Sequence, residues 1–285
     1  MGKLRSLLDK QRRLLMAGSP VPALVGNRPP PGESPVDWNL LHPERVVEAT
    51  AAWVAAGANL IRSNTSGAGR YALARENRED QLRKLNQTGV ELARQGAGSA
   101  LVVGVVNATG VLPLPYGKVA ETEIAAAFRE QVAVLVEAGV DAVSLENMGL
   151  LEEAQLAVKA VQEVDPGLDI LVLLAFQPGS RGFQTLHGVE CQWASRELGQ
   201  AGVTALGGMC LPGQDLPGLL AGDLRRASKL PPVLELGKEW EEAEEEDFTR
   251  RLQDLSRPGE IILAAGGEAG PEIVARLARG LLALA

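Results

Sequence analysis

The chain has 285 residues, of which 46% are hydrophobic, and a formal net charge of −8 at pH 7. This length and apolar content are enough to bury a large core, in one large domain or two small ones. The acidic balance argues against binding to nucleic acid or to an anionic membrane, because both reward dense lysine and arginine, and two cysteines are too few for a disulfide framework.

The N-terminal segment, residues 1–18, is basic, but Asp9, Gln11 and Arg12 interrupt its apolar residues. It therefore lacks the unbroken apolar core of a signal peptide, and no run in the chain approaches the length of a transmembrane span. We expect residues 1–22 to form a helical segment that packs on the following domain, and we expect the protein to be cytoplasmic.

Short, almost wholly apolar runs then recur along residues 23–285, as is typical of parallel strands buried on both faces. The expected strands are Ala23–Asn27, Asn59–Asn64, Leu101–Asn107, Asp141–Asn147, Asp169–Phe176, Thr204–Cys210, Pro232–Leu236 and Glu260–Ala265. Segments of helical periodicity lie between them, among them Glu44–Ala56, Glu121–Ala138 and Leu151–Val164, and Glu272–Leu282 closes the chain. This alternation predicts a single α/β domain with the (β/α)₈ architecture of a TIM barrel.

In such barrels the functional site lies at the carboxyl ends of the strands. The residues there are mostly polar although the strands before them are apolar: Gly26, Asn27, Asn64, Thr65, Ser66, Asn107, Glu146, Asn147, Met148, Phe176, Gln177, Met209, Cys210, Glu235, Lys238, Gly266, Gly267 and Glu268. Their convergence on one rim predicts a pocket for a small molecule, without specifying a reaction.

Glu146 and Cys210 each allow two interpretations. An unpaired carboxylate after a buried strand is costly, so Glu146 is either satisfied by backbone amides or a nearby arginine, or is the counter-charge for a bound ammonium group. A lone buried cysteine such as Cys210 is more often a small hydrophobic residue than a ligand. Cys191 begins a helix and is expected to be packed, and His42 and His187 have no paired ligand at helical spacing.

Several stretches carry a recognisable pattern in order along the chain. They are NLLHPERV at 39–46, AGANLIRSNTSGA at 56–68, GVVNATG at 104–110, QVAVLVEAGVDAVSLE at 131–146 and GVTALGGMC at 202–210. These stretches resemble the motifs NLxHPExV, AGADxIxTNTFGA, GSxGPTG, EQVxxLxEAGVDxxxxET and GVDAxGxNC of the homocysteine S-methyltransferase family. The resemblance runs from about Leu14 to the C-terminus and implies a methyltransferase of one-carbon metabolism.

In that family a zinc ion held by three cysteines binds the homocysteine thiol and leaves it deprotonated, because the thiolate is the methyl acceptor. The resemblance implies that Cys210 is the first zinc ligand and that Glu146 holds the amino group of the substrate. It also implies that the pocket around an amino-acid-like or methylated substrate includes Gly26, Asn27, Asn64, Thr65, Asn107 and Met209.

The chain departs from the family pattern at three strands. The family's GGCCGTTPEHI becomes AAGGEAGPEIV at 264–274, so that Gly266 and Gly267 stand where two zinc-binding cysteines are expected. Val25 replaces the aspartate of DGxMGT, and ELGKE at 235–239 replaces the PNAG ending. Since glycine has no side-chain ligand and zinc normally needs at least three protein ligands, the family zinc is doubtful here.

Several functions therefore stay open. The first is a methyltransferase whose zinc-dependent thiol activation is lost or altered, with a small methyl donor or a corrinoid or folate carrier on a partner protein. The second is a non-catalytic barrel that binds an amino acid or a regulatory partner. The third is ordinary zinc-dependent methylation with a substitute ligand set, in which Cys210 joins Glu235, Glu268 or His187. Gly266 and Gly267 before a helix also allow an anion site, which Glu268 disfavours.

Overall fold

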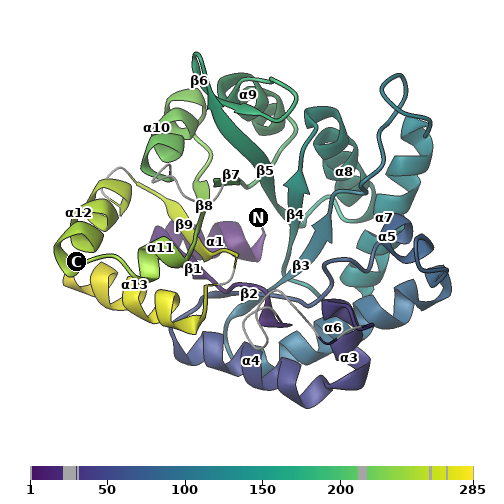
Figure 1. Ribbon diagram of the computed structural model, residues 1–285, viewed down its shortest axis with the longest axis horizontal. Helices are drawn as coiled ribbons and strands as arrows, with labels where there is room; N and C mark the ends of the chain where they lie inside the picture. Colours follow the sequence, from purple (N-terminus) through teal and green to yellow (C-terminus); the bar gives the residue numbers. More distant parts are fainter. Residues whose placement is uncertain are drawn as a thin grey trace.

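A closed barrel of parallel strands forms the centre of the computed structural model, which describes residues 2–21, 30, 32–210, 217–256, 259–267 and 269–284 (Figure 1). Within these residues eight parallel strands pair in the order β1-β2-β3-β4-β5-β7-β8-β9, and β9 pairs with β1 to close the barrel. The strands are β1 (Arg13–Met16), β2 (Leu60–Arg62), β3 (Leu101–Asn107), β4 (Ala142–Met148), β5 (Asp169–Gly179), β7 (Ala205–Cys210), β8 (Pro232–Leu236) and β9 (Ile261–Ala265). The predicted fold class, a (β/α)₈ barrel, is confirmed.

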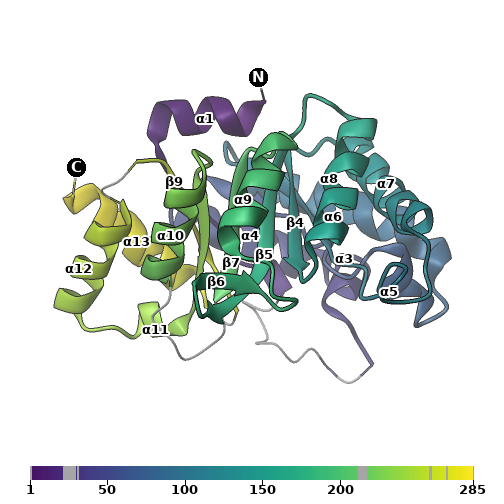
Figure 2. The same ribbon diagram turned by 90° about the horizontal axis from the view of Figure 1, so that it is seen from above.

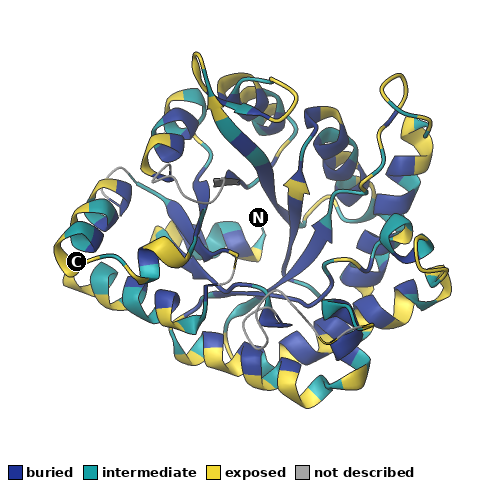
Figure 3. Ribbon diagram, in the orientation of Figure 1, coloured by how far each residue is buried: buried dark blue, intermediate teal, exposed yellow. Residues whose placement is uncertain are grey.

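Helices surround the barrel and turn their apolar faces toward it, while their outer faces are exposed (Figure 3). They are α1 (Lys3–Gln11), α3 (Trp38–Leu41), α4 (Pro43–Ala55), α5 (Arg70–Ala74), α6 (Leu82–Ala97), α7 (Glu121–Glu137), α8 (Leu151–Val164), α9 (Cys191–Gln200), α10 (Pro217–Ala227), α11 (Lys238–Glu241), α12 (Glu245–Ser256) and α13 (Pro271–Ala283). Two short 3₁₀ turns, η1 (Pro35–Asp37) and η2 (Glu79–Gln81), lie in the loops. None of the described helices is both long and apolar enough to span a membrane.

The first barrel strand lies earlier than the sequence analysis expected. Arg13–Met16, which we assigned to the N-terminal helical segment, forms β1 and pairs with both β2 and β9. Only Arg12 separates the end of α1 from the start of β1, so the helical pattern and the strand pattern merge in the sequence. The expected strand Ala23–Asn27 lies wholly outside the described residues.

One end of the barrel is covered by α1, and the other end is open to the loops that follow the strands (Figure 2). Leu4 and Leu8 of α1 are fully buried against the interior side chains of the barrel strands. The carboxylate of Asp169, at the start of β5, accepts hydrogen bonds from the backbone N–H groups of Leu4 and Arg5 at 2.8 and 3.2 Å. Because α1 closes this end, a ligand reaches the barrel interior only from the carboxyl ends of the strands.

A hairpin that the sequence analysis did not predict extends the sheet. Strand β6 (Gly182–Thr185) pairs antiparallel with the end of β5, with Phe176 opposite Thr185 and Gly179 opposite Gly182. The hairpin projects beyond the barrel on the same side as the loops that follow the strands.

Candidate functional site

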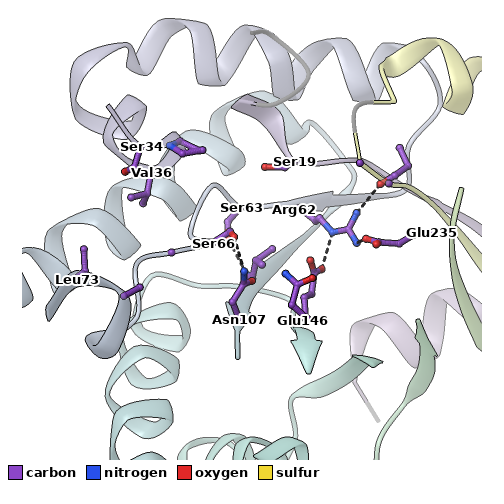
Figure 4. Close-up of a pocket in the computed structure, with 18 of the residues that line it drawn as sticks. Ser19, Ser34, Val36, Arg62, Ser63, Ser66, Leu73, Asn107, Glu146 and Glu235 are labelled. Atoms are coloured by element: carbon purple, nitrogen blue, oxygen red, sulfur yellow. Dashed lines mark hydrogen bonds and ion pairs between the residues drawn. The ribbon is translucent and has the colours of Figure 1, made fainter. Parts of the chain in front are cut away.

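A cavity of about 510 Å³ lies at the carboxyl ends of the barrel strands. Residues from the ends of β2, β3, β4, β8 and β9 form its floor, and the loops after β1 and β2 form its walls (Figure 4). Its lining comprises Ser19, Ser34, Pro35, Val36, Arg62, Ser63, Ser66, Gly67, Ala72, Leu73, Arg75, Glu76, Val105, Asn107, Glu146, Asn147, Glu235, Ala265, Gly266 and Gly267. This is the position that the sequence predicted for a small-molecule pocket.

The guanidinium group of Arg62, at the end of β2, is the centre of the floor (Figure 4). Its Nε donates a hydrogen bond of 2.8 Å to Glu146, and its Nη2 donates to Glu235. Its Nη1 donates to the backbone oxygens of Ala17 and Ala265 at 2.9 and 3.1 Å. Arg62 is only 4% exposed, and these hydrogen-bond partners take the place of the water that it loses on burial.

The two carboxylates beside Arg62 are held differently. Glu146 Oε1 accepts from both Arg62 and the hydroxyl of Ser144, the latter at 2.7 Å, whereas Glu235 Oε1 accepts from Arg62 alone. No described residue donates a hydrogen bond to the second oxygen of either carboxylate. Both side chains line the cavity.

Burial and mutual charge set the protonation of this cluster. Burial alone would lower the pKa of Arg62, but the charges of Glu146 and Glu235 raise it, so the guanidinium stays protonated. Burial and the charge of Glu146 raise the pKa of Glu235 from 4.5 to about 7, although Arg62 opposes that rise. Two carboxylates share one cation in a poorly hydrated place, and Glu235 is the one that takes up a proton near neutral pH.

Asn107 and the serines form a polar wall beside the charged floor. The side-chain amide of Asn107, at the end of β3, donates to the Ser66 hydroxyl at 2.9 Å, and Figure 4 shows this pair beside Arg62 and Glu146. The side-chain oxygen of Asn107 is buried and has no hydrogen-bond partner within the described residues. An enclosed polar atom without a partner is uncommon in folded proteins.

Asn64 and Thr65 lie behind the cavity and do not line it. Asn64 donates to the backbone oxygen of Pro35 at 2.7 Å and to Asn39 at 2.9 Å. The Thr65 hydroxyl donates to the backbone oxygen of Val105 at 2.8 Å. Both side chains hold the loop after β2 in place, and it is Ser63 and Ser66 of the same loop that reach the cavity.

The other predicted site residues divide into three groups. Asn107, Glu146, Asn147, Glu235, Gly266 and Gly267 line the cavity. Gly26, Asn27, Val25 and Glu268 lie outside the described residues, and so do the side chains of Met209 and Cys210, whose backbones pair with Ala175 and Phe176 of β5. Lys238 is exposed on α11, Cys191 is buried on α9, and neither they nor His42 and His187 line the cavity.

Arg62 is a cavity residue that the sequence analysis did not indicate, and it bears on the first interpretation of Glu146. A nearby arginine does bond one oxygen of Glu146, and the role of Glu146 as a counter-charge for an ammonium group stays a prediction. The signal was an arginine inside a short buried strand, between Ile61 and Ser63, because a fully buried arginine is almost always paired.

The zinc ion that the resemblance implies does not fit the described donor groups. Gly266 and Gly267 offer no side-chain ligand, and among the described residues no three histidine, cysteine or carboxylate side chains lie together so as to hold a metal ion. The backbone is also built for glycine there. A Cβ on Gly266 would lie 2.9 Å from the Cβ of Glu235, and Gly267 has a φ of +59°, which residues with a side chain rarely adopt.

The sequence of this chain is similar to those of homocysteine S-methyltransferases. The sequence profile described as homocysteine S-methyltransferase matches residues 27–257. Betaine–homocysteine S-methyltransferase 1 of Sus scrofa is 30% identical over 177 residues, which cover 59% of this chain and 60% of that protein. The enzyme of the same name from Rattus norvegicus is also 30% identical over 177 residues, covering 59% of this chain and 41% of that protein. The match thus spans less than two thirds of the length of either relative.

A solved structure supports the fold over almost the whole chain. The homocysteine methyltransferase MmuM from Escherichia coli, in its metallated form, superposes with a TM-score of 0.80 at 21% identity, covering 97% of this chain and 99% of that one. The profile match over residues 27–257 and the closed barrel together show that the chain belongs to the homocysteine S-methyltransferase family.

Proposed function

We propose that this chain is a methyltransferase that binds a small amino-acid-like acceptor in the cavity at the barrel mouth and activates it without the three-cysteine zinc site. The observation that carries the proposal is the floor of the cavity. There Arg62 fixes Glu146 and Glu235 so that each keeps one carboxylate oxygen that no described residue binds, while the neighbouring positions 266 and 267 are glycines.

The charges of the floor support an acceptor that carries an ammonium group. With both carboxylates ionised, Arg62 leaves the cluster one negative charge in excess, and Glu146, as the family resemblance implies, would accept hydrogen bonds from the ammonium group. A bound cation would restore the charge balance of this buried cluster.

The proposed donor is a small methylated compound, or a methyl group that a corrinoid or folate carries on a partner protein. The first experiment incubates the purified chain with L-homocysteine and, in turn, with S-methylmethionine, betaine, methylcobalamin and methyltetrahydrofolate, in the presence of a chelator. Mass spectrometry then measures S-methylated product. Product formation from one of these donors in chelator supports the proposal, and the absence of product with every donor overturns it.

Metal content tests the alternative that zinc is kept on a substitute ligand set. Elemental analysis of protein purified in zinc-replete buffer, with and without homocysteine, would give far less than one zinc per chain under our proposal. About one zinc per chain, lost in Cys210→Ala, would instead make ordinary zinc-dependent thiol methylation the function.

A non-catalytic binding role is the second candidate, and one observation favours it. Arg62 already neutralises much of the charge of Glu146, the residue that the family resemblance assigns to the substrate's amino group. Calorimetric binding of homocysteine or methionine, without product from any donor, would make the chain a binding protein.

A further inference from the structure

Glu235 presents one fixed and one free carboxylate oxygen at the floor of the cavity. Its Oε1 accepts a hydrogen bond from Arg62, and its other oxygen has no partner among the described residues. Its side chain is 11% exposed, and that exposure is to the cavity that it lines. A carboxylate oxygen in this position accepts a hydrogen from a bound molecule without first giving up another partner.

Glu146 is held by more donors than Glu235. Its Oε1 accepts two hydrogen bonds, from Arg62 and Ser144. Glu235 accepts only one, and lies beside the negative charge of Glu146. Glu235 is therefore the carboxylate of this pair that is held by fewer donors and whose raised pKa lets it exchange a proton near neutral pH.

We infer that Glu235 is the general base that removes the acceptor's hydrogen in the proposed methyl transfer, in place of activation by a metal ion. The inference rests on the proposed function. For a thiol acceptor, the Glu235 carboxylate takes the S–H hydrogen as a proton while the sulfur electron pair forms the new S–CH₃ bond. The bond between the methyl carbon and its sulfonium or quaternary ammonium donor breaks, and its electron pair stays on the donor, which becomes neutral. Glu235 then releases the proton to solvent.

The proton affinity of Glu235 suits this role. Burial raises its pKa to about 7, so the carboxylate is largely ionised just above neutral pH. A thiol has a pKa of about 8.5, so transfer of its proton to Glu235 is unfavourable by only about 30-fold, against about 10⁴-fold for an ordinary glutamate.

The test uses Glu235→Gln, which keeps the shape and the hydrogen bond to Arg62 but cannot take a proton. We expect kcat to fall by about 100-fold while the KM for homocysteine changes by less than about threefold. We also expect the wild-type rate to decline only as pH falls below 7, whereas the rate of the variant should decline already below the thiol's own pKa of about 8.5, because only thiolate formed without the base can react. Glu48→Gln, an exposed glutamate on α4, removes the same charge and should leave kcat unchanged.

A surrogate donor separates this inference from the proposed function. Methyl iodide methylates a bound thiol without any recognition of the natural donor, and the product is measured by mass spectrometry. Faster methylation of bound than of free homocysteine, lost in Glu235→Gln, supports the inference even when no natural donor gives product. Equal rates for wild type and Glu235→Gln overturn it, even when natural donors give product.

Two further outcomes are decisive. If Glu235→Gln fails to fold, Glu235→Asp takes its place and should keep the decline in rate below pH 7, whereas a rate independent of pH in both wild type and Glu235→Asp overturns the inference. If no thiol binds to the wild-type chain, the inference and the proposed function both fail.

Discussion

Arg62 is the residue on which the barrel mouth depends most. It joins β2 to β4 through Glu146, to β8 through Glu235 and to β9 through the backbone of Ala265. Removing one partner of a buried ion pair is costly because the charge left behind is neither solvated nor paired. Here two carboxylates would be left behind.

We therefore expect Arg62→Met to lower the free energy of unfolding by about 3–5 kcal/mol, as measured by urea denaturation. Arg70→Met is the matched control, because Arg70 pairs with Glu130 on the surface, where both side chains are about 40% exposed. Its loss should cost less than about 1 kcal/mol. A cost below about 1 kcal/mol for Arg62→Met would show that the cluster does not need its cation.

Glu235 gives stability a pH dependence with a defined sign. Its pKa is raised from 4.5 to about 7 in the folded chain, so the folded state binds the proton more tightly than the unfolded state. This contribution is fully present below pH 4.5 and is lost as pH rises through 7, by up to about 3 kcal/mol. Asp37 and Asp141 have lowered pKa values, so their contributions are lost below about pH 4, outside this window.

Thermal unfolding of wild type and Glu235→Gln between pH 5 and 7.5 measures this effect. The wild-type melting temperature should fall toward the upper end of that range relative to the variant, whose curve should be flatter. Parallel curves for the two proteins would mean that Glu235 does not change its protonation on unfolding.

At the scale of single elements, the sequence predicted most of the barrel. The bounds of β3, β8 and α8 are those expected, because each is an uninterrupted apolar or helical pattern between clear breaks. The error at β1 arose where one pattern runs into the next. Hairpin strand β6 was missed because Gly182–Thr185 is short and partly exposed and carries no apolar alternation.

The site was less predictable than the elements, for a physical reason. Position in the barrel identified Glu146, Glu235 and Asn107, since the ends of parallel strands meet at one rim. Which side chain of the loop after β2 turns inward depends on hydrogen bonds made by Asn64 and Thr65 to distant backbone. Such contacts have no local sequence pattern.

We expect helix α1 to stabilise the closed end of the barrel. Leu8 is fully buried against the interior of the barrel, whereas Leu282 on α13 is 78% exposed. Leu8→Ala should lower the free energy of unfolding by about 2–5 kcal/mol, because it leaves a cavity under the closed end of the barrel. Leu282→Ala should change it by less than about 0.5 kcal/mol. Equal effects in urea denaturation would mean that α1 does not seal the barrel.

For the whole molecule, the barrel mouth is one structure assembled from distant parts of the chain. Gly266 follows β9, and a Cβ there would meet the Cβ of Glu235 from β8, whose carboxylate is in turn bound by Arg62 from β2. We therefore expect Gly266 and the position of Glu235 to depend on one another. We predict that cysteines at 266 and 267 alone do not restore a metal site while Glu235 stays in place.

The double variant Gly266→Cys/Gly267→Cys tests this dependence. We expect it to bind well below one zinc per chain and to lose about 1–3 kcal/mol of stability, because Cys at 266 presses on Glu235 and Cys at 267 must adopt a positive φ. Adding Glu235→Gly removes the Cβ that a side chain at 266 would meet and should raise zinc content. Elemental analysis and urea denaturation measure both. One zinc per chain in the double variant at wild-type stability would show that the two glycines and the ion cluster are independent features of this barrel.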